Sequence, residues 1–183
     1  MALPDRLMIH PAAYPNLEVH RAGFPLDHPY LEQCWSPILG PSSVLLLRHT
    51  AQLWRDQSPA HVDTADLAQH IGLGKGTGTH SPLGHTVNRI VRFRFAEWAA
   101  PGVLDVYTEV RPIRDRDLRR LPDWNAARHD QLLERHLELL VDGPSNQAPT
   151  SPQHESDSAS LMAQRLDQFA ATRTPQIQSG LGR

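Results

Sequence analysis

The feature that most constrains the fold is a change in the spacing of apolar residues at Phe93. Before this residue, apolar side chains recur at helical spacing and mark one buried face: Leu83, Val87, Ile90 and Val91. After it, every second residue belongs to the same face, as in a β-strand: Leu104, Val106, Thr108 and Val110. We therefore expect a helix over 81–93 followed by a β-hairpin over 93–111, with its turn at Ala99 to Gly102.

The expected helix over 81–93 also carries a distinctive polar face. Ser81 is a natural N-cap, and Pro82 occupies the first helical position that proline prefers. The side opposite the apolar face holds residues spaced i, i+3, i+4 and i+7: His85, Asn88, Arg89 and Arg92. Most helix faces of this composition are simply solvated, but nucleic-acid-binding helices share it.

Two helices are expected before this one and two after the hairpin. Residues 40–56 begin with serines suited to an N-cap and place Val44, Leu47, Ala51 and Trp54 on one face. Residues 62–72 offer Asp63 as the N-cap, Gly72 as the stop, and a stripe of Leu67, Ala68 and Ile71. Residues 114–122 predict a short helix. Residues 123–143 predict a long one, whose Leu133, Leu137 and Leu140 serve either a homodimer or the chain's own core.

Composition divides the chain into three parts. Residues 1–40 are expected to form an extended arm, because their prolines are spaced too closely for a long helix, and to pack onto the domain through Phe24, Tyr30, Leu31 and Trp35. Residues 41–142 form the domain. Residues 143–183 begin with a stretch without large apolar residues and are expected to be a disordered tail. A short amphipathic segment in this tail either docks on the domain or a protein partner, or frays at the surface: Met162, Leu166 and Phe169.

The glycine-rich segment 72–81, GLGKGTGTHS, invites a nucleotide-binding interpretation that its details do not support. A Walker-type loop follows a strand and has Ser or Thr after its Gly-Lys pair, whereas here a helix precedes the loop and Gly76 follows Lys75. The alternating glycines do not satisfy G-x-G-x-x-G either. We expect the segment to end one helix and let the chain turn into the next.

No catalytic arrangement is recognisable, and we expect neither an enzyme nor a cofactor. Cys34 is the single cysteine, which favours a structural thiol. Three of the eleven histidines, His70, His80 and His85, are near the glycine loop, but no metal-ligand spacing joins them. Ser81 lacks the glycines of a nucleophile elbow.

Three helices followed by a hairpin, over residues 42–111, resemble the winged helix-turn-helix superfamily, in particular bacterial, and among them actinobacterial, winged-helix regulators. The stretch DTADLAQHIGLG resembles the first helix and turn of that motif, SPLGHTVNRIVRF its recognition helix, and RFAEWAAPGVLDVYTEV its wing. One departure is the turn over 72–81, which is longer than is usual in the family. The implied fold class is mainly α with a small β-hairpin wing, followed by the C-terminal helix and tail.

This resemblance implies sequence-specific binding of double-stranded DNA by a transcriptional regulator. Arginine pairs with guanine, asparagine with adenine, and other basic residues with phosphate. The candidate DNA-binding residues are Lys75, His85, Asn88, Arg89, Arg92, Arg94 and Arg111. Local charge agrees, since the segment 75–120 holds nine basic and five acidic residues, a net +4 in a chain whose formal net charge is -2. Gly84, beside His85, leaves room for close approach of a phosphate backbone.

Two further expectations concern partners and location. The N-terminus lacks a signal-peptide core and no apolar run is long enough to span a bilayer, so we expect a cytoplasmic, nucleoid-associated protein without a membrane partner. The alternative to DNA binding is a winged-helix adaptor, whose arm and tail recruit other proteins.

Overall fold

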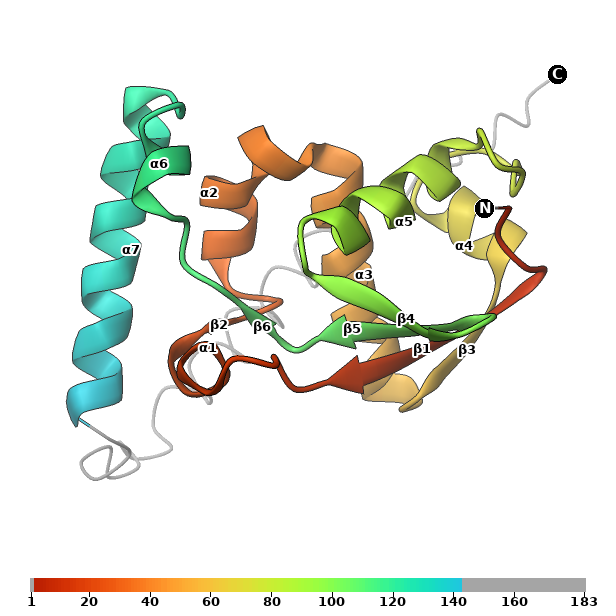
Figure 1. Ribbon diagram of the computed structural model, residues 1–183, viewed down its shortest axis with the longest axis horizontal. Helices are drawn as coiled ribbons and strands as arrows, with labels where there is room; N and C mark the ends of the chain where they lie inside the picture. The colour runs from red at the N-terminus through yellow and green to blue at the C-terminus, as the bar shows by residue number, and fades with distance from the viewer. Residues whose placement is uncertain (1, 143–183) are drawn as a thin grey trace, which may run out of the picture. The chain divides into compact units, whose positions relative to one another are not determined.

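The computed structural model describes residues 2–142, which form a mixed α/β fold of seven helices and six strands (Figure 1). In chain order these are β1 (Arg6–Ala12), α1 (Leu17–Ala22), β2 (Phe24–Pro25), α2 (Pro29–Leu39), α3 (Pro41–Asp56), β3 (Ala60–Asp63), α4 (Thr64–His70), α5 (Pro82–Arg92), β4 (Ala96–Ala100), β5 (Val103–Tyr107), β6 (Glu109–Val110), α6 (Asp115–Leu118) and α7 (Asp123–Asp142). The expected tail over 143–183, with its amphipathic segment, lies outside the described residues.

The main sheet has four strands in the order β3-β1-β5-β4. β1 pairs antiparallel with β3, opposing Ile9 to Ala60, and parallel with β5, opposing Ile9 to Leu104. β4 and β5 form the predicted hairpin, although β4 extends through Ala100, so that the turn is at Pro101 and Gly102. The sheet is therefore larger than a hairpin, because an N-terminal strand lies between β3 and β5.

One face of this sheet is buried and the other is open. In β1, Leu7 and Ile9 are each 1% exposed, whereas the alternate residues Arg6 and His10 are exposed. Helices α3, α4 and α5 lie over the buried face (Figure 1). An antiparallel or mixed sheet commonly has one face on the core and one in water, and the period of two in the sequence follows from that arrangement.

The helices expected before the hairpin are present, with one difference at a cap. Asp63 caps α4, accepting hydrogen bonds from the N–H groups of Ala65 and Asp66 at 2.9 and 3.0 Å. The expectation that a serine caps α3 is wrong, because Gly40 is the N-cap, with φ 77°, and Pro41 is the first helical residue. Both serines therefore lie inside the first turn, and α3 has no side-chain cap.

Residues 1–40 do not form the extended arm that their prolines suggested. Residues 29–39 form an eleven-residue helix, α2, that contains Pro37, and residues 6–12 are an inner strand of the sheet. Pro11 is tolerated because the pairing with β3 ends at Ile9, which leaves one edge of β1 free of ladder bonds at the proline. The predicted packing is confirmed, since four aromatic and aliphatic side chains are at most 1% exposed: Phe24, Tyr30, Leu31 and Trp35.

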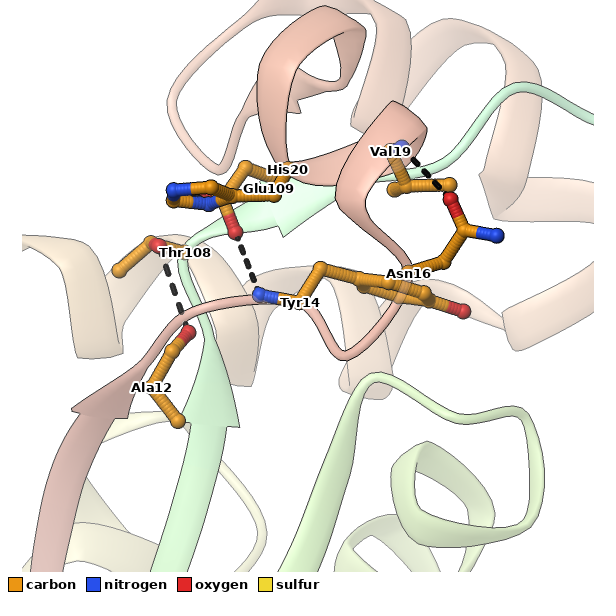
Figure 2. A network of polar contacts seen from close by, with 7 residues as sticks. All are labelled: Ala12, Tyr14, Asn16, Val19, His20, Thr108 and Glu109. Carbon is orange, nitrogen blue, oxygen red and sulfur yellow. Dashed lines mark hydrogen bonds and ion pairs between the residues drawn. The ribbon is translucent and has the colours of Figure 1, made fainter.

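Polar contacts also hold the N-terminal segment to the chain beyond β5 (Figure 2). The backbone N–H of Tyr14 donates to Glu109 Oε2 at 3.0 Å, and His20 Nδ1 lies 2.8 Å from Oε1 of the same carboxylate. The N–H of Thr108 donates to the carbonyl of Ala12 at 3.0 Å. Both oxygens of Glu109 are therefore used, one to hold α1 and the other to hold the connection between β1 and α1 against β6.

The C-terminal helix α7 is present, but its leucine stripe is not its buried face. Leu137 and Leu140 are 46% and 44% exposed, whereas Asn125, His129 and Leu132 are buried. Polar contacts join this helix to α2: Asn125 Nδ2 donates to the carbonyl of Gln33 at 2.7 Å, and Tyr30 Oη bonds to His129 Nδ1. The alternative in which all three leucines of the stripe pack into the chain's own core is therefore wrong.

A fall in pH should weaken this fold. Burial lowers the pKa of His28, His49 and His129 below the ordinary value of 6.5. Below pH 6.5 the unfolded state therefore binds more protons than the folded state, and the free energy of unfolding falls as pH drops through this window, while above it these groups contribute no pH dependence. Urea denaturation followed by tryptophan fluorescence at pH 7.5 and 5.5 measures the difference.

The contribution of His129 is separable with a matched pair of variants. His129→Gln keeps an acceptor for Tyr30 Oη without a titrating ring and should flatten the pH dependence. His61→Gln, at an exposed position of β3, should not. Equal slopes in wild type and His129→Gln would contradict the role of His129.

Candidate nucleic-acid interface

Helix α5 presents the predicted polar face to solvent. His85, Asn88, Arg89 and Arg92 are all exposed, and with Phe93 they line one open hollow. The opposite side of the helix is buried in the core: Leu83, Val87 and Ile90 are at most 1% exposed. Four of the seven candidate residues are therefore gathered on one surface, while Lys75, Arg94 and Arg111 lie outside this hollow.

The start of α5 is fixed as expected. Ser81 is the N-cap, and its hydroxyl oxygen accepts a hydrogen bond from the N–H of Gly84 at 3.0 Å. Pro82 follows as the first helical residue. Thr86 is buried, and its hydroxyl donates to the carbonyl of Pro82 at 2.8 Å, which anchors the first turn internally. These bonds fix the first turn of α5 without using any side chain of its exposed face.

Arg89 differs from the other polar residues of α5 because it is already engaged. Its Nη2 donates to the carbonyl of Ile38 at 2.9 Å, and its guanidinium lies 5.9 Å from the ring centroid of Phe93. The carbonyl of Ile38 belongs to the last turn of α2. Arg89 therefore links α5 to the junction of α2 and α3, where its remaining N–H groups are available to an acceptor.

Arg94 adopts a backbone conformation that usually belongs to glycine. The N–H of Phe95 donates to the carbonyl of Ile90, and that of Arg94 to the carbonyl of Val91, which is the pair of bonds of a Schellman motif. Arg94 has φ 62°, in the left-handed region. At the end of α4, Gly72 holds the equivalent place with φ 76°. An exposed arginine is thus kept at a strained position.

Arg111 is packed against the core and is not on the exposed surface of α5. Its guanidinium lies over the ring of Trp35 at 4.9 Å, and Trp35 Nε1 donates to the Arg111 carbonyl at 3.0 Å. Burial lowers the pKa of Arg111, and its Nη1 is buried without a hydrogen-bond partner among residues 2–142. A role for Arg111 in packing of α2 against β6 fits this environment better than a nucleic-acid contact.

The glycine segment is anchored at its beginning and near its middle. After α4, the N–H of Gly72 donates to the carbonyl of Gln69, and that of Leu73 to the carbonyl of Ala68. Midway, the N–H of Leu3 donates to the carbonyl of Thr77 at 3.2 Å. Lys75 is exposed on the segment. The predicted turn is therefore tied to the N-terminal segment.

Gly84 has a packing role and is not available to an external backbone. It is buried, and a Cβ atom at this position would lie 3.0 Å from Ser81 Oγ and 3.3 Å from the carbonyl oxygen of Gly78. The glycine segment thus packs directly against α5, and this contact leaves little room for a side chain at position 84. The expected close approach is made by the protein's own loop.

The histidines near the glycine segment separate into two pairs. The rings of His80 and His85 are 6.2 Å apart, while His70 stacks on His49 at 4.4 Å. Among residues 2–142, no group of three or more metal-ligating side chains is placed to hold an ion. Cys34 is fully buried in α2, and burial raises the pKa of its thiol to about 11.

A second hollow adjoins α5, and sequence reasoning missed it. It lies at the first turn of α3 and shares His85 and Arg89 with the α5 face. Ser42 and Ser43 line it. The sequence suggested a serine as the helix cap, whereas the cap is Gly40, and this leaves both serines inside the first turn, beside the hollow. The one local signal for this arrangement is the Gly-Pro pair that precedes the serines.

Comparisons of the chain with protein-family models, curated proteins and solved structures found no match. None of the helices within residues 2–142 is long and apolar enough to cross a bilayer.

The strain at Arg94 is measurable. Arg94→Gly should raise the free energy of unfolding by about 0.5–1 kcal/mol, because relief of the left-handed conformation exceeds the extra entropy of glycine in the unfolded chain. Gly72→Ala is the reciprocal control and should lower it by about 1 kcal/mol, since a Cβ there meets no atom within 4 Å and only the backbone cost remains. Chemical denaturation measures both. A loss of stability in Arg94→Gly would show that the side chain makes a compensating contact.

Proposed function

We propose that α3 to β5 act as a winged helix-turn-helix that binds double-stranded DNA, in a transcriptional regulator. The observation that carries this proposal is the exposed face of α5, with His85, Asn88, Arg89 and Arg92 on one surface. The order of elements from α3 to β5 supports the proposal, because it is helix, strand, helix, helix and hairpin. The major groove of DNA admits an α-helix, and its base edges accept and donate hydrogen bonds to such side chains.

The contacts that these residues make within the protein support a different role for each of them. Asn88 and Arg92 are exposed and make no hydrogen bond to residues 2–142, so their side chains are free to meet base edges. Arg89 is tethered to the Ile38 carbonyl, which places its charge beside the α3 N-terminus and favours a phosphate contact. His85 lies between the two hollows and suits either.

Two elements beside α5 complete the proposed surface. The β4–β5 hairpin is the proposed wing, and Arg94 lies two residues before it in the left-handed conformation. Lys75 on the glycine segment is a proposed phosphate contact. Phosphate contacts fix orientation on the duplex without reading sequence.

A protein-binding adaptor is the second candidate, and the end of α7 favours it. Leu137, Leu139, Leu140 and Val141 are between 44% and 85% exposed, in a helix whose buried contacts are made elsewhere. An apolar surface of this kind marks protein interaction sites, a second copy of the chain included. This candidate predicts no affinity for duplex DNA.

The proposal is tested by fluorescence anisotropy with the DNA upstream of the protein's own gene and with random duplex, at two salt concentrations. Affinity should fall steeply with salt, because bound phosphates release counterions. Asn88→Ala and Arg92→Ala should each reduce the binding free energy on a preferred sequence by about 1–3 kcal/mol. Each should also narrow the difference in affinity between that sequence and random duplex. Lys75→Ala should lower the affinity for all sequences by the same factor.

Arg120→Ala supplies a matched control, since it removes an exposed arginine beyond α6. It should leave affinity unchanged. Absence of duplex binding at low salt, or equal losses from Arg120→Ala and Arg92→Ala, would contradict the proposed interface.

A further inference from the structure

The hollow at the junction of α2 and α3 has the composition of an anion site. It has a volume of about 210 Å³ and is lined by the end of α2, the first turn of α3 and one side of α5: Leu39, Gly40, Pro41, Ser42, Ser43, His85, Thr86 and Arg89. None of these lining residues is acidic. A basic side chain and a helix N-terminus therefore meet there without a compensating carboxylate.

The first turn of α3 has two backbone N–H groups without a partner in the described part of the chain. The first N–H with a partner inside this helix is that of Val44, which donates to the carbonyl of Gly40 at 3.3 Å. Pro41 has no N–H, and the N-cap Gly40 has no side chain to accept one. Within residues 2–142, no group accepts a hydrogen bond from the N–H of Ser42 or of Ser43, which lie at the positive end of a sixteen-residue helix. A helix end in this state favours an anion.

A second, independent observation is the side chain of Ser43. Ser43 is 2% exposed, lines the hollow, and its hydroxyl makes no hydrogen bond to any residue within 2–142. Its oxygen is not a fully buried atom, because Arg111 Nη1 is the one fully buried side-chain atom within residues 2–142 that lacks a partner, so the Ser43 hydroxyl retains access to the hollow. The hollow is the place from which a ligand oxygen would satisfy it.

Arg89 supplies charge to the same place. Its bond to the Ile38 carbonyl fixes the guanidinium at the junction of α2 and α3, and its other N–H groups remain free of protein partners within the described chain. Guanidinium groups bind phosphate oxygens with two parallel hydrogen bonds. Fixing the arginine beforehand lowers the entropy lost when an anion binds.

We propose that this hollow binds a phosphate group, through the N–H groups of Ser42 and Ser43, the Ser43 hydroxyl and the Arg89 guanidinium. Two sources share this chemistry: a backbone phosphate of DNA and a free phosphorylated small molecule. The site does not depend on the proposed function, because phosphate binding by the protein alone is measurable without DNA.

The first experiment titrates inorganic phosphate into the full-length ¹⁵N-labelled protein at constant ionic strength. The amide resonances of Ser42 and Ser43 should shift and saturate. Ser42→Glu should abolish saturation because its carboxylate occupies the positive helix end, yet raise the melting temperature for the same reason. Ser43→Ala should weaken binding roughly fivefold, as expected for one hydrogen bond. Leu45→Glu adds the same charge at an exposed position of α3 outside the hollow and should bind as wild type does.

The second experiment measures duplex affinity of the same variants. A uniform loss on all sequences in Ser42→Glu, but not in Leu45→Glu, identifies a DNA phosphate as the ligand. Unchanged duplex affinity, with phosphate binding lost, identifies a free phosphorylated ligand. Saturable phosphate binding by a wild type that binds no duplex would refute the proposed function and uphold this site. Non-saturating shifts, or equal phosphate binding by wild type and Ser42→Glu, would overturn the site.

Discussion

The fold depends on the hydrogen bonding of β1 along both of its edges. β3 and β5 are each bonded to β1 and not to one another, so removal of this strand would leave two inner edges without partners. Leu7 and Ile9 add apolar area to the same ladder, since each is 1% exposed. Unpaired backbone groups in a buried sheet are expensive, and therefore the first twelve residues are required for the sheet that supports α3, α4 and α5.

The position of α5 follows from that sheet through a short series of contacts. Phe95 follows α5, is 1% exposed, and packs edge-to-face on Trp35 with ring centroids 4.9 Å apart. Trp35 in turn bonds to the carbonyl of Arg111 beyond β5. Because Trp35 belongs to α2, the N-terminal forty residues set the junction of α2 and α3 beside α5, and with it both hollows.

Sequence succeeded where the decisive interaction is local and failed where it is distant. Asp63, Ser81 and Pro82 act within three residues, so their cap roles were predictable from spacing alone. Strand β1 was not predicted, because its partner β5 lies far along the chain and Pro11 is unfavourable in a strand. The local signal that was present is the alternation of the buried Leu7 and Ile9 with less buried neighbours. The packing of Arg111 was not predictable for the same reason, since its location depends on Trp35, which no local pattern relates to it.

Arg89 shows why the two hollows act together in the proposed interface. Its tether to the Ile38 carbonyl keeps its charge at the α3 N-terminus, while Asn88 and Arg92 remain untethered on the same helix. A phosphate held by the first turn of α3 would thus be bound at a fixed offset from the residues proposed to meet bases. Since α3 and α5 rest on one core, this offset is set by packing and not by the bound DNA, which is the condition for contacts to the backbone to fix the register of contacts to bases.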